Sequence, residues 1–195
     1  MEIKCFVVGP LLTNCYYLVS GKEVIVIDPG GGLRKILKEL KDKKLNYIIL
    51  THYHLDHTLV AQRLKEETGA KILIHKEEKD FIKSLPFSAS FQKKEKRLVF
   101  QPDQFLEDGE EINLGNEFLK IIHTPGHTKG SICILGKDFI LTGDTIFEEG
   151  YGRTDLPGGS KKDLENSLKK LEKIIQPGMI IYPGHGPVFR KPFEK

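Results

Sequence analysis

The chain has 195 residues, of which 39% are hydrophobic and 29% charged, and its formal net charge is only +3. These values are typical of a soluble globular protein. So small a charge predicts no nucleic-acid partner, because nucleic-acid binding usually shows as a clustered basic face. No apolar run approaches the roughly 18 residues that a membrane-spanning helix needs, so we expect no membrane partner either.

The N-terminus and the cysteines bear on the cell compartment. Residues 1–4 lead directly into a strand-like run, without the apolar segment of an export signal, so we expect a cytoplasmic location. The three cysteines, Cys5, Cys15 and Cys133, form an odd and irregularly spaced set, which argues against a disulfide framework. Each lies in an apolar strand-like run, so all three are predicted to be buried packing residues.

The first half of the chain is predicted to alternate strands with helices. Strand-like runs cover residues 3–8, 14–20, 24–28, 47–50 and 72–74. A helix is predicted after the glycines at 30–32 by apolar residues at i, i+3, i+4 and i+7, namely Leu33, Ile36, Leu37 and Leu40. A second helix is expected just after residues 52–57, with Leu59, Val60 and Leu64 facing inward and Gly69 ending it.

Residues 76–100 are the least regular part of the sequence. Phe81, Ile82 and Leu85 predict one short helix, and a serine- and lysine-rich stretch follows it. The composition is compatible with a mobile flap that borders the functional site and with a plain surface connection.

The second half returns to strands, at residues 111–114, 117–122, 131–135, 139–141 and finally 179–181. Ser160 and Asp163 resemble the capping pair of a last helix. The inner face of that helix is predicted to carry Leu164, Leu168, Leu171 and Ile175. The order is strands then helices, twice, with no flexible linker. It predicts an α/β chain with two stacked sheets covered outside by helices, a four-layer αββα sandwich in a single domain over residues 1–195.

The turn after the predicted strand at 47–50 concentrates side chains that can bind metal. Four candidate ligands lie within six residues there: His52, His54, Asp56 and His57. Imidazole nitrogens and carboxylate oxygens are ligands that zinc and iron accept. Three further candidates, each just past a predicted strand, complete the set: His127, Asp144 and His185. Loops at strand ends commonly carry functional groups on a rigid scaffold, so the sequence predicts a metal site.

This pattern resembles the metallo-β-lactamase superfamily, whose signature His-x-His-x-Asp-His is met in full by residues 52–57. The resemblance implies the metallo-β-lactamase fold and two divalent metal ions, with zinc expected first and iron or manganese as alternatives. It implies that the first metal is held by His52, His54 and His127. It implies that the second is held by Asp56, His57 and His185, and that Asp144 bridges the two. Asp56 is also assigned as catalytic, and a metal-bound hydroxide is expected to attack a small-molecule substrate.

Other polar residues leave two interpretations each. Asp28 either supports the metal ligands from below or belongs to an ordinary turn. His75 is expected at the surface or in a cap, and His123 either orients a ligand or is structural. Arg153 either meets a carboxylate of the substrate or forms an internal tie with Asp155.

The segment at 150–159 is similar to that of the glyoxalase II-like, or hydroxyacylglutathione hydrolase-like, subgroup, which implies hydrolysis of acyl thioesters. Glyoxalase II proper has a C-terminal helical extension that helps to hold glutathione. This chain stops ten residues after His185, so weak discrimination for the thiol half is expected. One alternative is a persulfide dioxygenase, which holds a single iron with residues that match His52, His127 and Asp144. The other is a different hydrolase of this fold, such as a lactonase or a nuclease.

Overall fold

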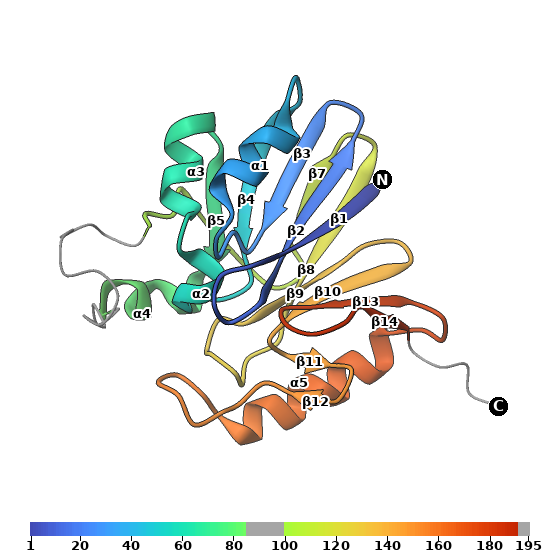
Figure 1. Cartoon of the computed structure of the whole chain (residues 1–195). Helices are drawn as coiled ribbons and strands as arrows, with labels where there is room; N and C mark the ends of the chain where they lie inside the picture. Colours follow the sequence, from blue (N-terminus) through green and yellow to red (C-terminus); the bar gives the residue numbers. More distant parts are fainter. Residues whose placement is uncertain (85–99, 191–195) are drawn as a thin grey trace.

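Two six-stranded sheets form the centre of the computed structural model, which describes residues 1–84 and 100–190 (Figure 1). The first sheet has the order β1-β2-β3-β4-β5-β6. Its strands are β1 (Glu2–Val8), β2 (Thr13–Ser20), β3 (Glu23–Ile27), β4 (Lys44–Leu50), β5 (Lys71–His75) and β6 (Gln104–Leu106). The first three strands pair antiparallel and the last four run parallel, as expected where helices connect successive strands.

The second sheet has the order β14-β13-β10-β9-β8-β7. Its strands are β7 (Glu111–Leu114), β8 (Glu117–His123), β9 (Ile132–Leu135), β10 (Phe139–Gly143), β13 (Ile180–Pro183) and β14 (Phe189–Arg190). Within it, β10 and β13 are parallel neighbours, so both strands end at the same edge. A separate two-stranded ribbon follows β10 and consists of β11 (Ile146–Phe147) and β12 (Gly150–Tyr151).

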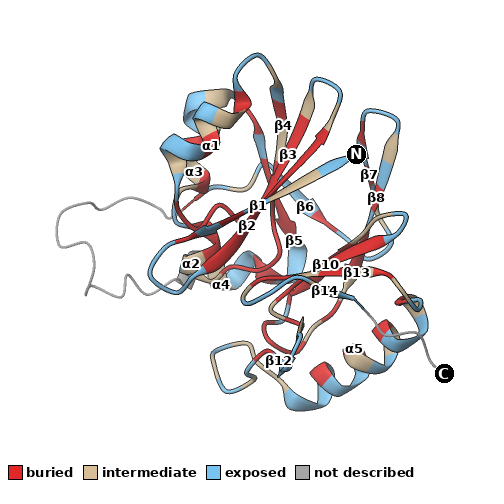
Figure 2. Cartoon of the chain, turned by 45° about the vertical axis from the view of Figure 1, so that its right-hand side comes forward, coloured by how far each residue is buried: buried red, intermediate tan, exposed pale blue. Residues whose placement is uncertain are grey.

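Helices cover the outer faces of both sheets, which confirms the predicted four-layer αββα sandwich (Figure 1). The helical segments on the side of the first sheet are α1 (Leu33–Leu40), α2 (Leu55–Thr58), α3 (Ala61–Thr68), a 3-10 turn η1 (Lys76–Glu78) and α4 (Lys79–Ser84). The second sheet is covered by α5 (Lys161–Ile174). Figure 2 shows α1 and α5 with mostly exposed outer faces, while the central strands are largely buried.

The alternation along β2 explains why its residues 15–19 form a continuous apolar run. Tyr16 and Leu18 point into the cluster between the two sheets, whereas Cys15, Tyr17 and Val19 point into the cluster beneath the helices. A strand buried on both faces has no polar side, so it appears as one continuous hydrophobic run.

Several expected details are confirmed at the ends of the helices. Gly69 ends α3 in the left-handed conformation, with φ of 72°. The hydroxyl of Ser160 caps α5 by accepting a hydrogen bond from the backbone N–H of Asp163 at 3.2 Å.

In the described part of the chain, no helix combines the length and the apolar surface that crossing a bilayer requires.

Other expectations are wrong. The predicted helix after residue 57 is split into α2 and α3, so Leu59 is 39% exposed and the inward positions belong to Ala61 and Leu64. Cys5 is exposed, because β1 is the edge strand of the first sheet.

On α5, Leu168 is only half-buried, and the neighbouring Ser167 takes the inward position through a hydrogen bond to the carbonyl of Pro125. The strand at 180–183 is not the last one, since β14 follows it. The short helix expected near Phe81 is present as α4, but residues 85–99 lie outside the described residues. The expectation of a flap or a surface connection there stays open.

One carboxyl group is buried where η1 meets the turn between β8 and β9. An oxygen of Glu78 accepts hydrogen bonds from the hydroxyl of Thr128 and, at 2.9 Å, from the backbone N–H of Gly130. Burial raises the pKa of Glu78 from its usual 4.5 to about 7, against the lowering effect of these two bonds. The folded protein therefore holds this proton more tightly than the unfolded chain does.

This pKa predicts how stability depends on pH. Because the pKa of Glu78 is higher in the folded state, its bound proton stabilises the fold fully at pH values below the unfolded pKa. That stabilisation is lost as pH rises towards the folded pKa of about 7. Glu78→Gln carries no such charge. Its stability relative to wild type should therefore rise by up to about 3 kcal/mol between about pH 5 and about pH 8, measured by urea unfolding. Parallel pH profiles for the two proteins would contradict the assignment.

Candidate metal centre

The seven predicted ligands meet where the ends of strands from both sheets approach each other. His52 and His54 follow β4, and α2 carries Asp56 and His57. The second sheet supplies the turn between β8 and β9, the end of β10 and the end of β13, which carry His127, Asp144 and His185. The parallel pairing of β10 and β13 places the last two side by side, and the backbone N–H of Gly184 donates to the carbonyl of Gly143 at 2.7 Å.

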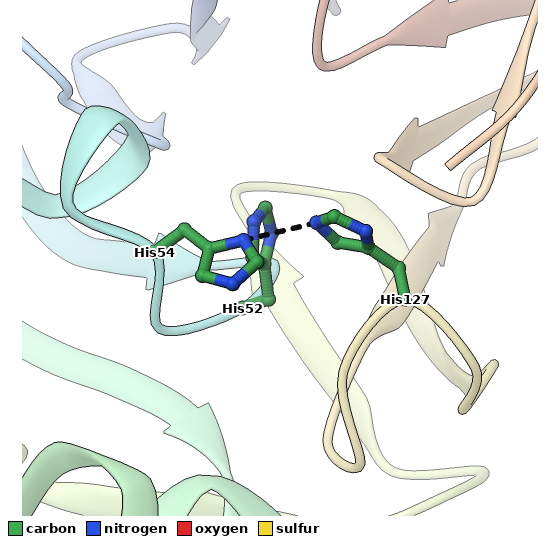
Figure 3. A group of neighbouring side chains, drawn as sticks. All are labelled: His52, His54 and His127. Carbon is green, nitrogen blue, oxygen red and sulfur yellow. Dashed lines mark hydrogen bonds between the residues drawn. The ribbon is translucent and has the colours of Figure 1, made fainter. Parts of the chain in front are cut away.

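A first cluster consists of His52, His54 and His127, whose ligand nitrogens all lie within 4.8 Å of one another (Figure 3). Nδ1 of His54 is 3.0 Å from Nε2 of His127. The rings come from the two sheets and converge on one point, which is the arrangement a bound cation requires.

A second cluster consists of Asp56, His57 and His185, again with ligand atoms within 4.8 Å of one another. Oδ2 of Asp56 is 3.3 Å from Nε2 of His57 and 3.2 Å from Nε2 of His185. Asp144 reaches both clusters, because its Oδ1 is 3.3 Å from His57 Nε2 and its Oδ2 is 3.5 Å from His127 Nε2. Its carboxylate thus lies between the two clusters.

Four of the five histidines have their second ring nitrogen fixed by an oxygen acceptor of the protein. The pairs are His52 with the Thr51 hydroxyl at 3.1 Å, His57 with Asp28 at 2.9 Å, His127 with the Arg153 carbonyl at 2.8 Å and His185 with the Leu11 carbonyl at 3.0 Å. These contacts hold Nδ1 in each ring and direct Nε2 to the centre. Such contacts set the tautomer and the angle of a metal-binding ring.

The carbonyl contacts also decide where the lone pairs lie. A carbonyl oxygen only accepts, so Nδ1 of His185 carries a proton, and the carboxylate of Asp28 sets the same tautomer in His57. In the neutral rings Nε2 then has only a lone pair, yet these two Nε2 atoms lie 3.2 Å apart. Two lone pairs at that distance repel, so a cation or an extra proton must sit at the centre.

The electrostatics of the site fit a divalent metal. Burial and the neighbouring histidines hold the pKa of His52 well below its usual range, and burial with His127 lowers the pKa of His54 to about 4. Both rings are therefore neutral near pH 7, as metal ligands must be. Burial acts against a charged His57, but Asp144 and Asp28 raise its pKa well above the usual value. The carboxylates thus favour positive charge at this point.

Two buried atoms supply a further test of fit. Within the described residues, Nε2 of His52 and Oδ1 of Asp144 are buried and have no hydrogen-bond partner. A buried polar atom without a partner costs free energy, and both atoms face the centre as metal ligands would.

Glycines allow the backbone to approach this centre closely. A Cβ atom on Gly184 would lie 2.2 Å from Oδ1 of Asp144, and one on Gly152 would lie 1.9 Å from the carbonyl oxygen of the same residue. A side chain at Gly184 would displace the carboxylate of Asp144, and one at Gly152 would displace its backbone.

Of the two interpretations of Asp28, the structure shows that the residue supports the cluster from below. Its carboxylate accepts from the backbone N–H of Thr51 at 2.7 Å, from the Thr51 hydroxyl at 2.6 Å and from His57. Since the Thr51 hydroxyl donates to Asp28, it accepts from Nδ1 of His52. One carboxylate therefore orients a histidine in each cluster.

The remaining histidines lie elsewhere. His75 is buried and not at the surface, and its Nδ1 caps η1 by accepting from the backbone N–H of Glu77 at 3.4 Å. The ring of His123 stacks on that of His75, with a centroid distance of 4.0 Å, and contacts the carbonyl of Lys129. The role of His123 is therefore structural. Arg153 forms the internal tie, with two hydrogen bonds of 2.7 and 2.6 Å to Asp155.

Sequence reasoning missed three residues of the site. Thr13 donates its hydroxyl to Asp56 at 3.1 Å, and Leu11 offers its carbonyl to His185. Both lie in the first hairpin, where no local pattern marks them. The third is Tyr53, whose ring lies against that of His54. Its position within the histidine motif, residues 52–57, was the one sequence feature that could have identified it.

Comparison with known proteins agrees with this geometry. The model of the family described as the metallo-beta-lactamase superfamily matches residues 8–185, a range that contains all seven clustered side chains. The chain is 32% identical over 192 residues to the probable metallo-hydrolase YqgX of Bacillus subtilis, covering 96% of this chain and 91% of that one. It is 34% identical over 193 residues to the hydroxyacylglutathione hydrolase GloC of Haemophilus influenzae, covering 95% and 91%.

A solved structure of TTHA1623 in a di-iron-bound form has the same fold, with a TM-score of 0.84 at 28% identity over 96% of this chain and 94% of that one. The family match extends over most of the sequence, and the fold and the histidine and aspartate clusters agree with it. The chain therefore belongs to the metallo-beta-lactamase superfamily.

Proposed function

We propose that this chain is a metallo-hydrolase of the glyoxalase II-like subgroup, which cleaves acyl thioesters at a centre of two divalent metal ions. The observation that carries the proposal is the pair of ligand clusters that share Asp144. His52, His54 and His127 would hold one ion, and Asp56, His57 and His185 the other. Zinc is the first candidate, and iron or manganese are alternatives; the di-iron form of TTHA1623 is consistent with iron.

Two ions at this position would lower the pKa of a water molecule and polarise a carbonyl oxygen of the substrate. The contribution of the protein is to keep Asp56 ionised there. In the metal-free chain burial opposes that charge, but the neighbouring rings of His185 and His57 outweigh this effect and lower the pKa of Asp56. Thr13 donates to Oδ2 of the same carboxylate, so its orientation is fixed. We assign Asp56 as a catalytic carboxylate as well as a ligand.

A thioester suits this site because its leaving group needs little help. A thiol has a pKa of about 8.5, so the thiolate departs without a strong proton donor. GloC, a relative that covers most of this chain, is named as a hydroxyacylglutathione hydrolase, and this supports a small-molecule thioester as the substrate.

Arg153 is the proposed contact for a carboxylate of the substrate. The guanidinium and its partner Asp155 are both exposed, at 63% and 66%. Solvent screens ion pairs between exposed side chains, so they contribute little to stability, and a substrate carboxylate can replace Asp155 at little cost.

An activity screen tests the substrate class directly. Protein loaded with zinc, or separately with iron, should hydrolyse lactoyl-glutathione and a thioester of a smaller thiol. Oxygen uptake with glutathione persulfide should stay at background. Rapid oxygen consumption without thioester cleavage would replace this proposal with a dioxygenase.

His185→Ala tests whether the second cluster is needed. The variant should lose roughly a hundredfold or more in turnover, because a missing ligand changes the metal and the water it activates. It should still fold, since His185 lies in a loop outside the three apolar clusters. His123→Ala, which removes a histidine outside the centre, is the matched control and should keep turnover within about tenfold of wild type. Turnover by His185→Ala equal to that of the control would show that the second ion is dispensable.

A further inference from the structure

Residues 152–160 form a loop, called here the 152–160 loop, that contacts the segment carrying His127. At its start the backbone N–H of Gly152 donates to the carbonyl of Thr145 at 3.4 Å. The carbonyl of Arg153 then accepts from Nδ1 of His127 at 2.8 Å. At its end, the N–H of Ser160 donates to the carbonyl of Gly126 at 2.8 Å. The loop is therefore part of what holds His127 in place.

The shape of the loop is set by bonds within it. The N–H of Gly159 donates to the carbonyl of Leu156 at 2.8 Å, and Arg153 pairs with Asp155. Internal bonds such as these fix the conformation of the loop but do not attach it to the histidine motif.

Tyr53 makes that attachment near the middle of the loop. It lies between His52 and His54 in the sequence, is 6% exposed, and donates its hydroxyl to the carbonyl of Pro157 at 2.9 Å. The centroid of its ring lies 4.6 Å from that of the His54 ring. The ring also stacks on Phe81 of α4, with a centroid distance of 5.2 Å and an interplanar angle of 18°. Packing on both sides therefore fixes the direction in which the hydroxyl points.

We propose that Tyr53 is a positioning residue that couples the histidine motif of the first sheet to His127 of the second. Its hydroxyl fixes the 152–160 loop at Pro157, and the carbonyl of Arg153 in that loop fixes the ring of His127. The consequence for metal binding rests on the proposed metal centre, whereas the effect on the His127 ring does not. Groups that orient a metal-binding histidine commonly alter metal affinity by about 10- to 100-fold.

Tyr53→Phe isolates the hydroxyl, because the ring and its stacking on Phe81 are kept. Tyr17→Phe is a matched control. The hydroxyl of Tyr17 also donates to a backbone carbonyl, that of Glu39, at 3.2 Å, and it joins β2 to α1 in the layer of α1. Both variants lose one tyrosine hydroxyl bond, but only one of these bonds leads to His127.

The experiment has two readouts. The first is the proton NMR signal of the His127 Nδ1–H in metal-free protein, which should exchange with water faster in Tyr53→Phe and at the wild-type rate in Tyr17→Phe. The second is zinc affinity, measured by chelator competition. One zinc ion should bind about tenfold more weakly in Tyr53→Phe, with the other unchanged.

Unchanged exchange and affinity in Tyr53→Phe would overturn the proposal. Equal changes in both variants would also overturn it, since they would reflect a general loss of stability. If wild-type protein bound no zinc, the proposed function would fail, and the exchange of the His127 proton would still decide the role of Tyr53.

Discussion

Three hydrogen bonds converge on the buried carboxylate of Asp28, and the orientation of two metal-site histidines depends on them. A buried carboxylate is costly unless its oxygens are satisfied, and here Thr51 and His57 satisfy both. Asp28 follows β3 and Thr51 follows β4, and these strands are parallel neighbours. The register of the sheet therefore places the acceptor beside its donors before any metal binds.

The rest of the centre repeats this arrangement with weaker acceptors. Carbonyl oxygens of Leu11 and Arg153 hold His185 and His127, and both come from loops that other contacts must fix. The centre lies between the two sheets, because segments that follow strands of the first sheet supply four of the candidate ligands and segments that follow strands of the second supply three. Its geometry therefore depends on the apolar cluster between the sheets, where residues such as Leu18 and Ile49 are fully buried.

Much of the fold could be predicted from the sequence because its main elements carry their own periodic signals. The α1 helix covers the four apolar positions that predicted it, and the strand at 111–114 was predicted to the residue. The strands that were missed, β6, β11, β12 and β14, have only two or three residues each, too few for a pattern to appear. They are defined by their pairing with another strand in the folded chain.

The site, too, could be predicted only in part from the sequence. The spacing of residues 52–57 identified the first four candidate ligands, and positions just past predicted strands identified the other three. The resemblance to a known family then implied how the seven divide between two metals. The contacts that orient them were beyond reach, because Tyr53 and Pro157 are 104 residues apart and Leu11 and His185 are 174 apart. Local sequence patterns contain no information on such pairs. The role of Asp28 stayed open for the same reason, since a carboxylate after a strand is as common in turns as beneath a metal.

The most direct test of this account is the metal content of wild-type protein and of Asp28→Asn, measured by elemental analysis after loading with zinc and removal of excess ion. Asparagine keeps the shape of the side chain but removes the charge that Thr51 and His57 share. The account predicts about two zinc ions per wild-type chain and a clear loss of bound zinc in Asp28→Asn, with a far-UV spectrum like that of wild type. Equal zinc content and equal affinity in the two proteins would contradict it.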